Sequence, residues 1–404
     1  LEPASVEKMA FPLPDKPSIA VLPFDNMSED PKQEYFSDGL SDQIISSLSK
    51  MPNLFVIARN STFTYKGKPV KIQKVAEDLG VKYVLEGSVQ KTTDRIRITA
   101  QLIDATTGHH VWSESYDRDP EDIFAIQDEI SLEIMKAMRV ELLEGEQALI
   151  WQKHETSNLK AFEKVLQGRH YATKGTKGDS ARALQLYEEA IALDPEYARA
   201  YAGMGLTHFF RARFGWAESR AESMKMAFKC AQKSIALDET LDIAYILLST
   251  VFVMRRDFEK AIVEAKKAVS LNPNGADAYS ALGGVLGLSG DWEESVTYAE
   301  KSIRLNPFPT VYYLHWLGRA YFMTEQYDKA IDTWKKALHK APKYLPAHAF
   351  LAASYISLDR QAEAAAAAQE VLRINPKFTL ESYAKTLPYK NMVDIERYIS
   401  ALRK

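Results

Sequence analysis

A short phrase that recurs at a near-constant step constrains the second half of this chain more than any single residue does. Each copy, such as Ile191-Ala-Leu-Asp-Pro195 or Ile303-Arg-Leu-Asn-Pro307, closes an amphipathic helix. The copies end at positions 195, 239, 273, 307, 342 and 376, so the step is 44 residues once and then 34 or 35. A period near 34 predicts a stacked array of helix pairs, because one pair cannot bury its own apolar face. Such arrays hold other proteins along a groove, which argues against an enzyme.

The residues between the closing prolines follow one template. In the fourth copy Gly318 and Tyr321 lie in a first helix, Ala330 and Trp334 lie in a second helix, and Pro342 ends it. Small residues let two helices approach each other, and large ones fill the space between pairs. Proline ends the second helix because it cannot donate the next backbone hydrogen bond. The pattern closely resembles the tetratricopeptide repeat, and we assign residues 158–376 to about six helix pairs.

Two stretches depart from this template. The second copy carries extra residues around Phe214 to Glu218, which are either a functional face of the array or a tolerated surface extension. After Pro376 the pattern changes, and Ile395, Tyr398 and Ile399 follow a helical spacing. We therefore expect residues 377–404 to form capping helices that shield the last repeat.

The first half of the chain has a different rhythm. Apolar strands are predicted at Ser18 to Phe24 and at Leu54 to Ala58, with a helix between them, so parallel pairing is expected. Three strands joined by hairpins follow between residues 81 and 116, and the middle one alternates apolar and polar residues. Asp122 is expected to cap a long helix. The fold class is therefore a mixed α/β sandwich domain at residues 18–146, followed by an all-α solenoid.

Composition sets outer limits on function. A net charge of -3 and a pI near 6.3 give no basic field for nucleic acid. Cys230 is the only cysteine, which excludes an internal disulfide and a cysteine-based zinc site. Residues 1–17 contain four prolines and are expected to form an extended linker. We expect no catalytic residue, no metal and no cofactor in this chain.

Five sequence segments of the first half resemble a known domain. The segments SIAVLPFDNMSEDPKQEYFSDGLSDQI, LFVIARNSTFTYKGKP, LGVKYVLEGSVQ, RIRITAQLIDATTGHHVWSESYDR and DIFAIQDEI together resemble the TolB-like (FlgO-type) domain. In bacterial signalling proteins this domain commonly precedes tetratricopeptide repeats. The resemblance implies an effector upstream, most often a class III adenylate or guanylate cyclase. It also implies a single membrane span before the Pro-rich stretch, which would place these residues outside the cytoplasm.

Two candidate sites follow from these patterns. First helices of such repeats line the concave face, so a groove for an apolar peptide or partner helix is predicted at Phe209, Phe210, Ile246, Met254, Tyr312, His315, Arg319, Phe322 and Met323. Some of these side chains could instead pack between repeats. Polar residues after the second predicted strand form a weaker candidate for a small-molecule or anion site, at Arg59, Asn60, Ser61, Tyr65 and Lys66.

These observations lead us to expect a non-catalytic sensory or regulatory module that binds a protein or peptide partner. The family resemblance adds a fused upstream cyclase and therefore a role in cyclic AMP signalling. Two alternatives stay open: a protein-interaction scaffold of the cell envelope, and the sensor half of a winged-helix transcription activator. The partner, the oligomeric state and the placement of the two halves are not specified by these patterns.

Overall fold

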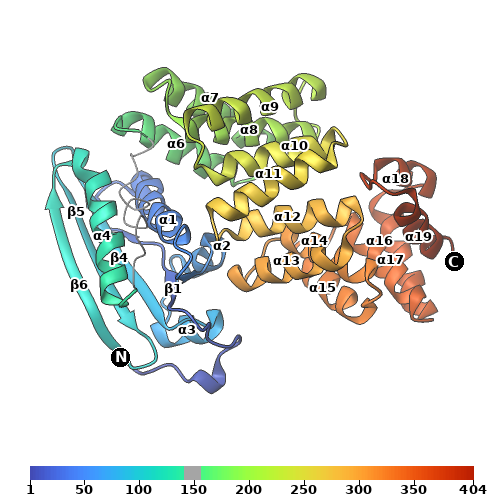
Figure 1. The fold of residues 1–404 in the computed structure, drawn as a ribbon, viewed down its shortest axis with the longest axis horizontal. Coiled ribbons are helices and arrows are strands. Elements are labelled where there is room, and N and C mark those ends of the chain that lie inside the picture. The colour runs from blue at the N-terminus through green and yellow to red at the C-terminus, as the bar shows by residue number, and fades with distance from the viewer. Residues whose placement is uncertain (141–155) are drawn as a thin grey trace. The chain divides into compact units, whose positions relative to one another are not determined.

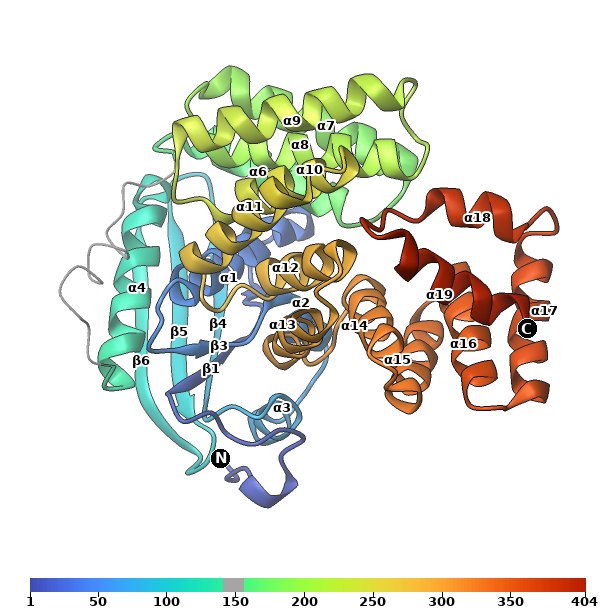
Figure 2. The same ribbon diagram turned by 45° about the vertical axis from the view of Figure 1, so that its right-hand side comes forward.

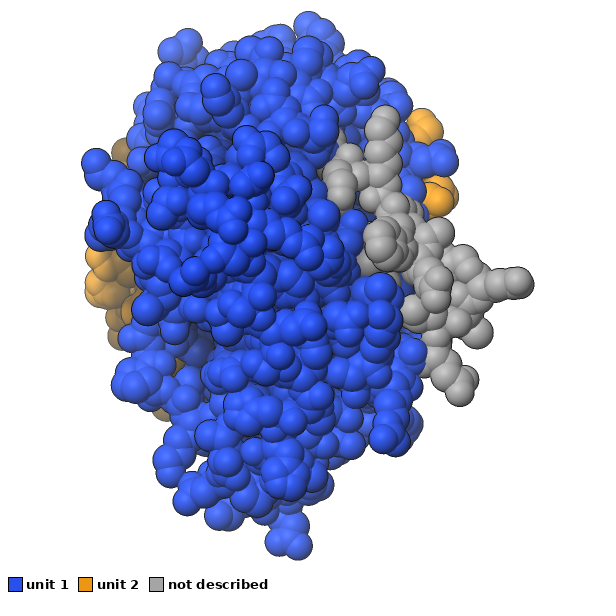
Figure 3. All heavy atoms as spheres, turned by 90° about the vertical axis from the view of Figure 1, so that its left-hand side faces the viewer, with its two compact units in different colours: residues 1–248, 268–275, 305–307 blue, residues 249–267, 276–304, 308–404 orange. Residues whose placement is uncertain are grey.

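The computed structural model describes residues 1–140 and 156–404, and the chain separates into two compact units. The first unit comprises Leu1–Leu248, Ala268–Gly275 and Leu305–Pro307. The second comprises Ser249–Lys267, Ala276–Arg304 and Phe308–Lys404, and Figure 3 colours the two differently. The expected end of the α/β domain at residue 146 lies outside the described residues.

The first unit contains a mixed sheet of six strands in the order β3-β1-β4-β5-β6, with β2 paired to β4. The strands are β1 (Ser18–Val21), β2 (Asp25–Asn26), β3 (Phe55–Val56), β4 (Tyr83–Lys91), β5 (Ile96–Asp104) and β6 (His109–Arg118). The first three are parallel to their partners, with Ser18 opposite Phe55 in the β1·β3 pair. The later two pairs, β4·β5 and β5·β6, are antiparallel. This topology confirms the parallel pairing and the hairpins predicted from the strand order.

One face of the sheet is covered by helices (Figure 1). The covering helices are α1 (Glu34–Ser49) and α4 (Ile123–Ala137). The domain also contains α2 (Arg59–Thr62) and α3 (Ile72–Leu79), whose buried side chains are not part of this core. The apolar stripe of α1 and that of α4 join the inward side chains of β5 in a single core. Asp122 stands at the N-cap position of α4, but a 3₁₀ turn (η4, Pro120–Asp122) precedes the helix and the side chain makes no capping hydrogen bond.

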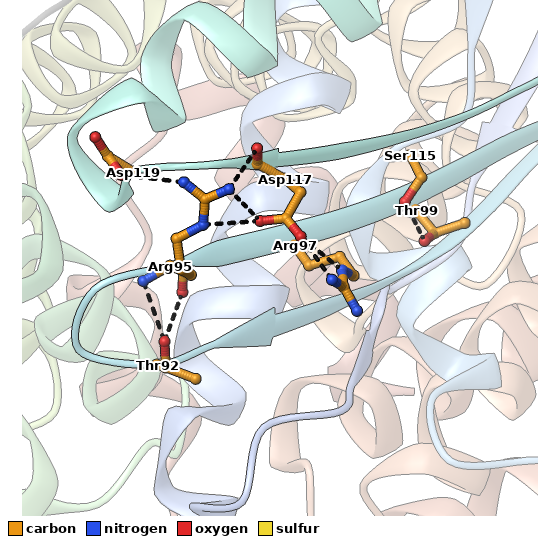
Figure 4. Close-up of polar contacts among 7 residues, drawn as sticks. All are labelled: Thr92, Arg95, Arg97, Thr99, Ser115, Asp117 and Asp119. Carbon is orange, nitrogen blue, oxygen red and sulfur yellow. Dashed lines mark hydrogen bonds and ion pairs between the residues drawn. The ribbon is translucent and has the colours of Figure 1, made fainter.

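The opposite face of β5 and β6 carries polar side chains in register (Figure 4). Arg97 donates to Asp117 at 2.6 Å, and Thr99 lies 3.2 Å from Ser115 on the neighbouring strand. The alternate residues of β5, from Ile96 to Leu102, are fully buried. The alternation read from the sequence is therefore confirmed, because successive side chains of a strand point to opposite faces.

The Pro-rich start of the chain is attached to the first unit. Its backbone donates from Ala4 to the Ala105 carbonyl at 2.7 Å and from Ala10 to the Glu77 carbonyl at 2.8 Å. The side chain of Glu77 accepts from the Ser5 amide at 3.1 Å. A short 3₁₀ helix, η1 (Val6–Lys8), lies between these contacts. Residues 1–17, which we expect to be an extended linker, are thus held against the α/β domain by these hydrogen bonds.

The remaining helices form antiparallel pairs. They are α6 (Leu159–Ala172), α7 (Lys177–Leu193), α8 (Ala198–Arg213), α9 (Arg220–Leu237), α10 (Asp242–Met254), α11 (Phe258–Leu271), α12 (Ala276–Ser289), α13 (Trp292–Leu305), α14 (Val311–Met323), α15 (Tyr327–Lys340), α16 (Leu345–Ser357) and α17 (Gln361–Ile374). A methyl group added at Gly318 of α14 would lie 2.5 Å from the ring of Trp334 in α15, so this glycine permits the close approach. An all-helical array after a mixed α/β domain is the predicted fold class.

Two shorter helices end the chain, α18 (Leu380–Thr386) and α19 (Met392–Arg403). Figures 1 and 2 both show α19 alongside α16. Ile395, Tyr398 and Ile399 are buried, as the helical spacing predicts. None of the described helices is both long and apolar enough to cross a bilayer.

Candidate partner-binding site

The groove residues of the first unit are divided between core and surface. Phe209 is buried, and its ring meets that of Phe210 edge to face at 5.4 Å. Phe210 is 40% exposed and stacks at 6.0 Å on Phe214, which belongs to the insertion after α8. Ile246 of α10 is buried. Phe210 and Phe214 therefore form an exposed aromatic pair, while Phe209 and Ile246 belong to the core.

The groove residues of the second unit are mostly covered. His315, Arg319, Phe322 and Met323 all come from α14 and are buried, whereas Met254 is half-buried. Tyr312, at the start of the same helix, is 39% exposed. The prediction of an open face at these four positions of α14 is therefore corrected by their burial. Their cover comes from the end of the chain.

Two tyrosines of residues 387–403, here called the C-terminal segment, lie against α14. The Nε atom of Arg319 donates to the Tyr389 hydroxyl at 3.1 Å, and its guanidinium lies 4.6 Å from the centre of that ring. The Tyr398 ring stacks on Phe350 at 4.0 Å and meets Phe322 edge to face at 5.6 Å. Both tyrosines are completely buried.

A chain of polar contacts links this segment to the array. Arg319 Nη1 lies 3.0 Å from His315 Nε2, and His315 Nδ1 lies 2.8 Å from the Tyr344 hydroxyl. Because a guanidinium can only donate, Nε2 must accept, and in the neutral ring Nδ1 then carries the proton and donates to Tyr344. Burial raises the pKa of Tyr389, although Arg319 opposes this, so its hydroxyl stays neutral. Arg319 and His315 thus act as donors along this chain of contacts, toward Tyr389 and Tyr344 respectively.

The loop before α19 touches the turns that join paired helices. Arg256 Nη2 donates to the Tyr389 carbonyl at 2.7 Å, and the Lys390 amide donates to the Leu288 carbonyl at 2.8 Å. Further along, Arg397 Nη1 donates to the Met323 carbonyl at 2.8 Å. The C-terminal segment therefore crosses three successive repeats of the second unit.

The candidate ligand loop after β3 is occupied by contacts within the first unit. Arg59 Nε lies 3.4 Å from Asp42, and burial lowers the pKa of Arg59. Lys66 pairs with Asp38 at 2.5 Å and with Glu34 at 2.8 Å. The Tyr65 hydroxyl donates to Asp78 at 3.2 Å, and burial followed by that carboxylate raises the pKa of Tyr65. Asn60 is half-buried beside them. These contacts hold the loop in place, and a ligand there stays a prediction.

Ser61 of that loop contacts one of the repeat-closing sequences, Ile303 to Pro307. Its hydroxyl donates to Asn306 Oδ1 at 2.6 Å, and the Ala58 amide donates to the Leu305 carbonyl at 2.8 Å. Asn274, which follows another copy of this sequence, donates to the carbonyls of Ser49 and Met51 at 3.0 Å. The sequences that end two of the repeats are thus hydrogen-bonded to the α/β domain within the first unit. No cluster of metal-ligating side chains occurs among residues 1–140 and 156–404.

Sequence reasoning missed the residues that occupy the groove. Tyr389 and Tyr398 were assigned to a cap, and Arg256 was not singled out. The sequence contains one usable signal, the pair Pro388-Tyr389 between two predicted helices, because proline there predicts an extended loop rather than a continued helix. No local spacing relates Tyr389 to Arg319, since the two are 70 residues apart.

Comparisons with known families identify the repeats. The TPR repeat matches residues 176–209, and the tetratricopeptide repeat matches residues 311–344. Residues 15–135 match the second domain of HilA/YgeH-like transcriptional regulators. The chain therefore carries tetratricopeptide repeats, an architecture that serves as a protein-interaction module.

Among curated proteins, "Putative adenylate cyclase 3" of Rhizobium meliloti (strain 1021) is 42% identical over 252 residues. The match covers 62% of this chain and 42% of that relative, so the chain spans less than half of the relative's length.

Solved structures align with parts of the chain. A thermophilic TPR protein of Thermus thermophilus is 20% identical, with a TM-score of 0.39, over 48% of this chain and 99% of its own. YrrB, described as a TPR protein with an unusual peptide-binding site, is 18% identical with a TM-score of 0.36, over 50% of this chain and 98% of its own. PilF of Pseudomonas aeruginosa is 16% identical with a TM-score of 0.43, over 56% and 98%.

Proposed function

We propose that this chain is a non-catalytic regulatory module that binds a protein or peptide partner and acts on a class III adenylate or guanylate cyclase domain in the same polypeptide. The observation that carries the proposal is the 42% identity, over 252 residues, to a protein named as an adenylate cyclase. The repeats supply the binding architecture. The attachment of two repeat signatures to the α/β domain supports a mechanical link between that domain and the array.

The test compares two proteins under the same conditions. The 404-residue chain is incubated with ATP or GTP and a divalent cation, and so is the complete product of the reading frame that contains it. We expect cyclic nucleotide only from the complete product. Formation of cyclic AMP by the 404-residue chain would contradict the non-catalytic assignment. A complete product that forms no cyclic nucleotide would contradict the fusion.

A second candidate is the sensor half of a winged-helix transcription activator. The observation that favours it is the match of residues 15–135 to the second domain of HilA/YgeH-like regulators. Under the first proposal the same residues form a TolB-like domain. Electrophoretic mobility shift of duplex DNA by the complete product, with no cyclic nucleotide formed, would select this candidate over the cyclase.

A further inference from the structure

The start of the C-terminal segment makes the contacts of a bound peptide, whereas its helix α19 packs on α16 as a cap does. Its loop, residues 387–391, presents backbone groups to Arg256 and Leu288 and one aromatic ring to Arg319. Backbone hydrogen bonds along a surface, combined with a pocket for one side chain, are how extended peptides are recognised. A cap would need to cover only the last pair, α16 and α17. This loop instead reaches the turn after α10 and the end of α12.

The pocket for Tyr389 is built from several repeats. Arg319 forms its floor, and Trp292 meets the Tyr389 ring edge to face at 5.6 Å. Nη2 of Arg319 is buried and has no hydrogen-bond partner among the described residues. A buried donor without a partner is costly, so the resident tyrosine satisfies this guanidinium only in part. A different occupant could use the remaining donor.

Besides its two buried tyrosines, the segment buries Leu387, Ile395 and Ile399. Its ion pairs, Lys390 with Glu259 and Arg397 with Glu325, are partly exposed and therefore contribute little to its retention. Met392 and Val393, at the start of α19, are 71% and 78% exposed. Elements with few buried contacts open at a lower free energy than the core. The loop at residues 387–391, which buries only Leu387 and Tyr389, is therefore the part of the segment that is most easily released.

We propose that the surface lined by Trp292, Arg319 and Phe350, here called the inner face of the second unit, is a peptide-binding surface. Its resident ligand is residues 387–398, and a partner binds by displacing these residues. The inference rests on the proposed function, since it assumes that the repeats bind a partner. The partner is an extended peptide that presents an aromatic side chain to Arg319. A proline before that residue favours the extended conformation, as Pro388 does here. A basic residue after it complements Glu259, as Lys390 does.

The test uses a synthetic fluorescein-labelled peptide with the sequence of residues 384–399 and the full chain. In the wild type, the resident segment competes, so the apparent affinity is lowered by the fraction of open molecules. Tyr389→Ala should raise the affinity for the peptide by about tenfold or more, measured by fluorescence anisotropy. Met392→Ala, in an exposed residue of the same segment, should bind like the wild type. Adding Arg319→Gln to Tyr389→Ala should abolish the gain.

Hydrogen exchange gives a second readout. The amides of residues 387–403 should exchange faster in Tyr389→Ala, while those of α14 should be unchanged. If Tyr389→Ala does not fold, Tyr389→Phe replaces it, because it keeps the ring and loses only the hydroxyl. We then expect a smaller gain in affinity, of about threefold to tenfold, since only one hydrogen bond is removed.

Three outcomes would overturn the inference. One is equal affinity of the peptide for the wild type and Tyr389→Ala, including no binding to either. Another is exchange of residues 387–403 as slow as that of α14 in every variant, which would make the segment a permanent cap. The third is a dimer of Tyr389→Ala by light scattering, which would assign the surface to a second copy of this chain. All three leave the cyclase test untouched, so the two proposals can fail separately.

Discussion

Arginine occurs in two opposite surroundings in this chain. On the outer face of β5 and β6, Arg95 and Arg97 are more than half exposed and pair with Asp117 (Figure 4). In α14 of the second unit, Arg319 is buried and contacts a tyrosine, a histidine and aromatic rings. No acidic side chain of the described residues forms an ion pair with Arg319.

The contribution of a charged side chain to stability depends on whether it is exposed or buried. An exposed pair exchanges hydration for a screened attraction, so little is gained. A buried guanidinium has lost its hydration, and each hydrogen bond that replaces water matters more. The sheet face therefore tolerates substitution, whereas the inner face of the second unit depends on a few aromatic and polar groups. Substitutions of buried and of exposed side chains test this contrast.

Trp334→Ala should destabilise the second unit by about 3–5 kcal/mol. Trp334 is completely buried, fills the space left by Gly318 and stacks on Phe350 at 5.0 Å. Trp216→Ala is the matched control, because Trp216 is half-buried in the insertion of the first unit. Differential scanning calorimetry of both variants should show a large loss for Trp334 only. Equal losses would contradict the assignment of Trp334 to the core.

Arg319→Gln and Arg97→Gln form the most direct test of the comparison. The first should lower the free energy of unfolding by about 1.5–3 kcal/mol, because hydrogen bonds of a buried charged group are lost. The second should leave the melting curve close to that of the wild type, because its partner is exposed. A loss on Arg97→Gln as large as that on Arg319→Gln would remove the contrast.

Gly318→Ala should cost about 1–3 kcal/mol, because the added methyl group would lie 2.5 Å from the Trp334 ring and force the packing apart. Gly178→Ala in α7 is its control. Nothing lies within 4 Å of a methyl group there, so the better helix former should be neutral or slightly stabilising. Chemical denaturation of the two variants gives the sign of each effect. A stabilising Gly318→Ala would show that α14 and α15 are not in close contact.

Local spacing predicted the elements of the first unit well. The two predicted apolar strands pair in parallel as β1 and β3, and β5 buries alternate residues as its period of two requires. These features are set by residues that lie close together in the sequence, so the sequence pattern is enough to predict them. The recurring sequence predicted the array for the same reason, because each copy marks one helix pair that packs on the next pair.

The cover on α14 could not be predicted in this way. The periodicity places His315 and Arg319 on one face of a first helix, but Tyr389 comes from a loop 70 residues later. Ser61 and Asn306, which are 245 residues apart, show the same limit in the first unit. Contacts of this kind are set by tertiary packing. A buried arginine and an exposed one look alike in a list of residues.

The smallest effect concerns the ion pairs on the outer face of the sheet. Hydrogen bonding from Arg97 and the charges of Arg95 and Arg97 lower the pKa of Asp117. A carboxyl group whose pKa is lower in the folded chain stabilises the fold above its ordinary value, and this contribution is lost as the pH falls through the lowered value. Asp117→Asn should therefore melt slightly below the wild type at neutral pH, and the two should converge in acid. Asp94→Asn, in the exposed hairpin turn, is the control for the substitution itself. A gap between Asp117→Asn and the wild type that persists in acid would mean that shape rather than charge explains the contribution of Asp117, and the contrast with Arg319 would then rest on burial alone.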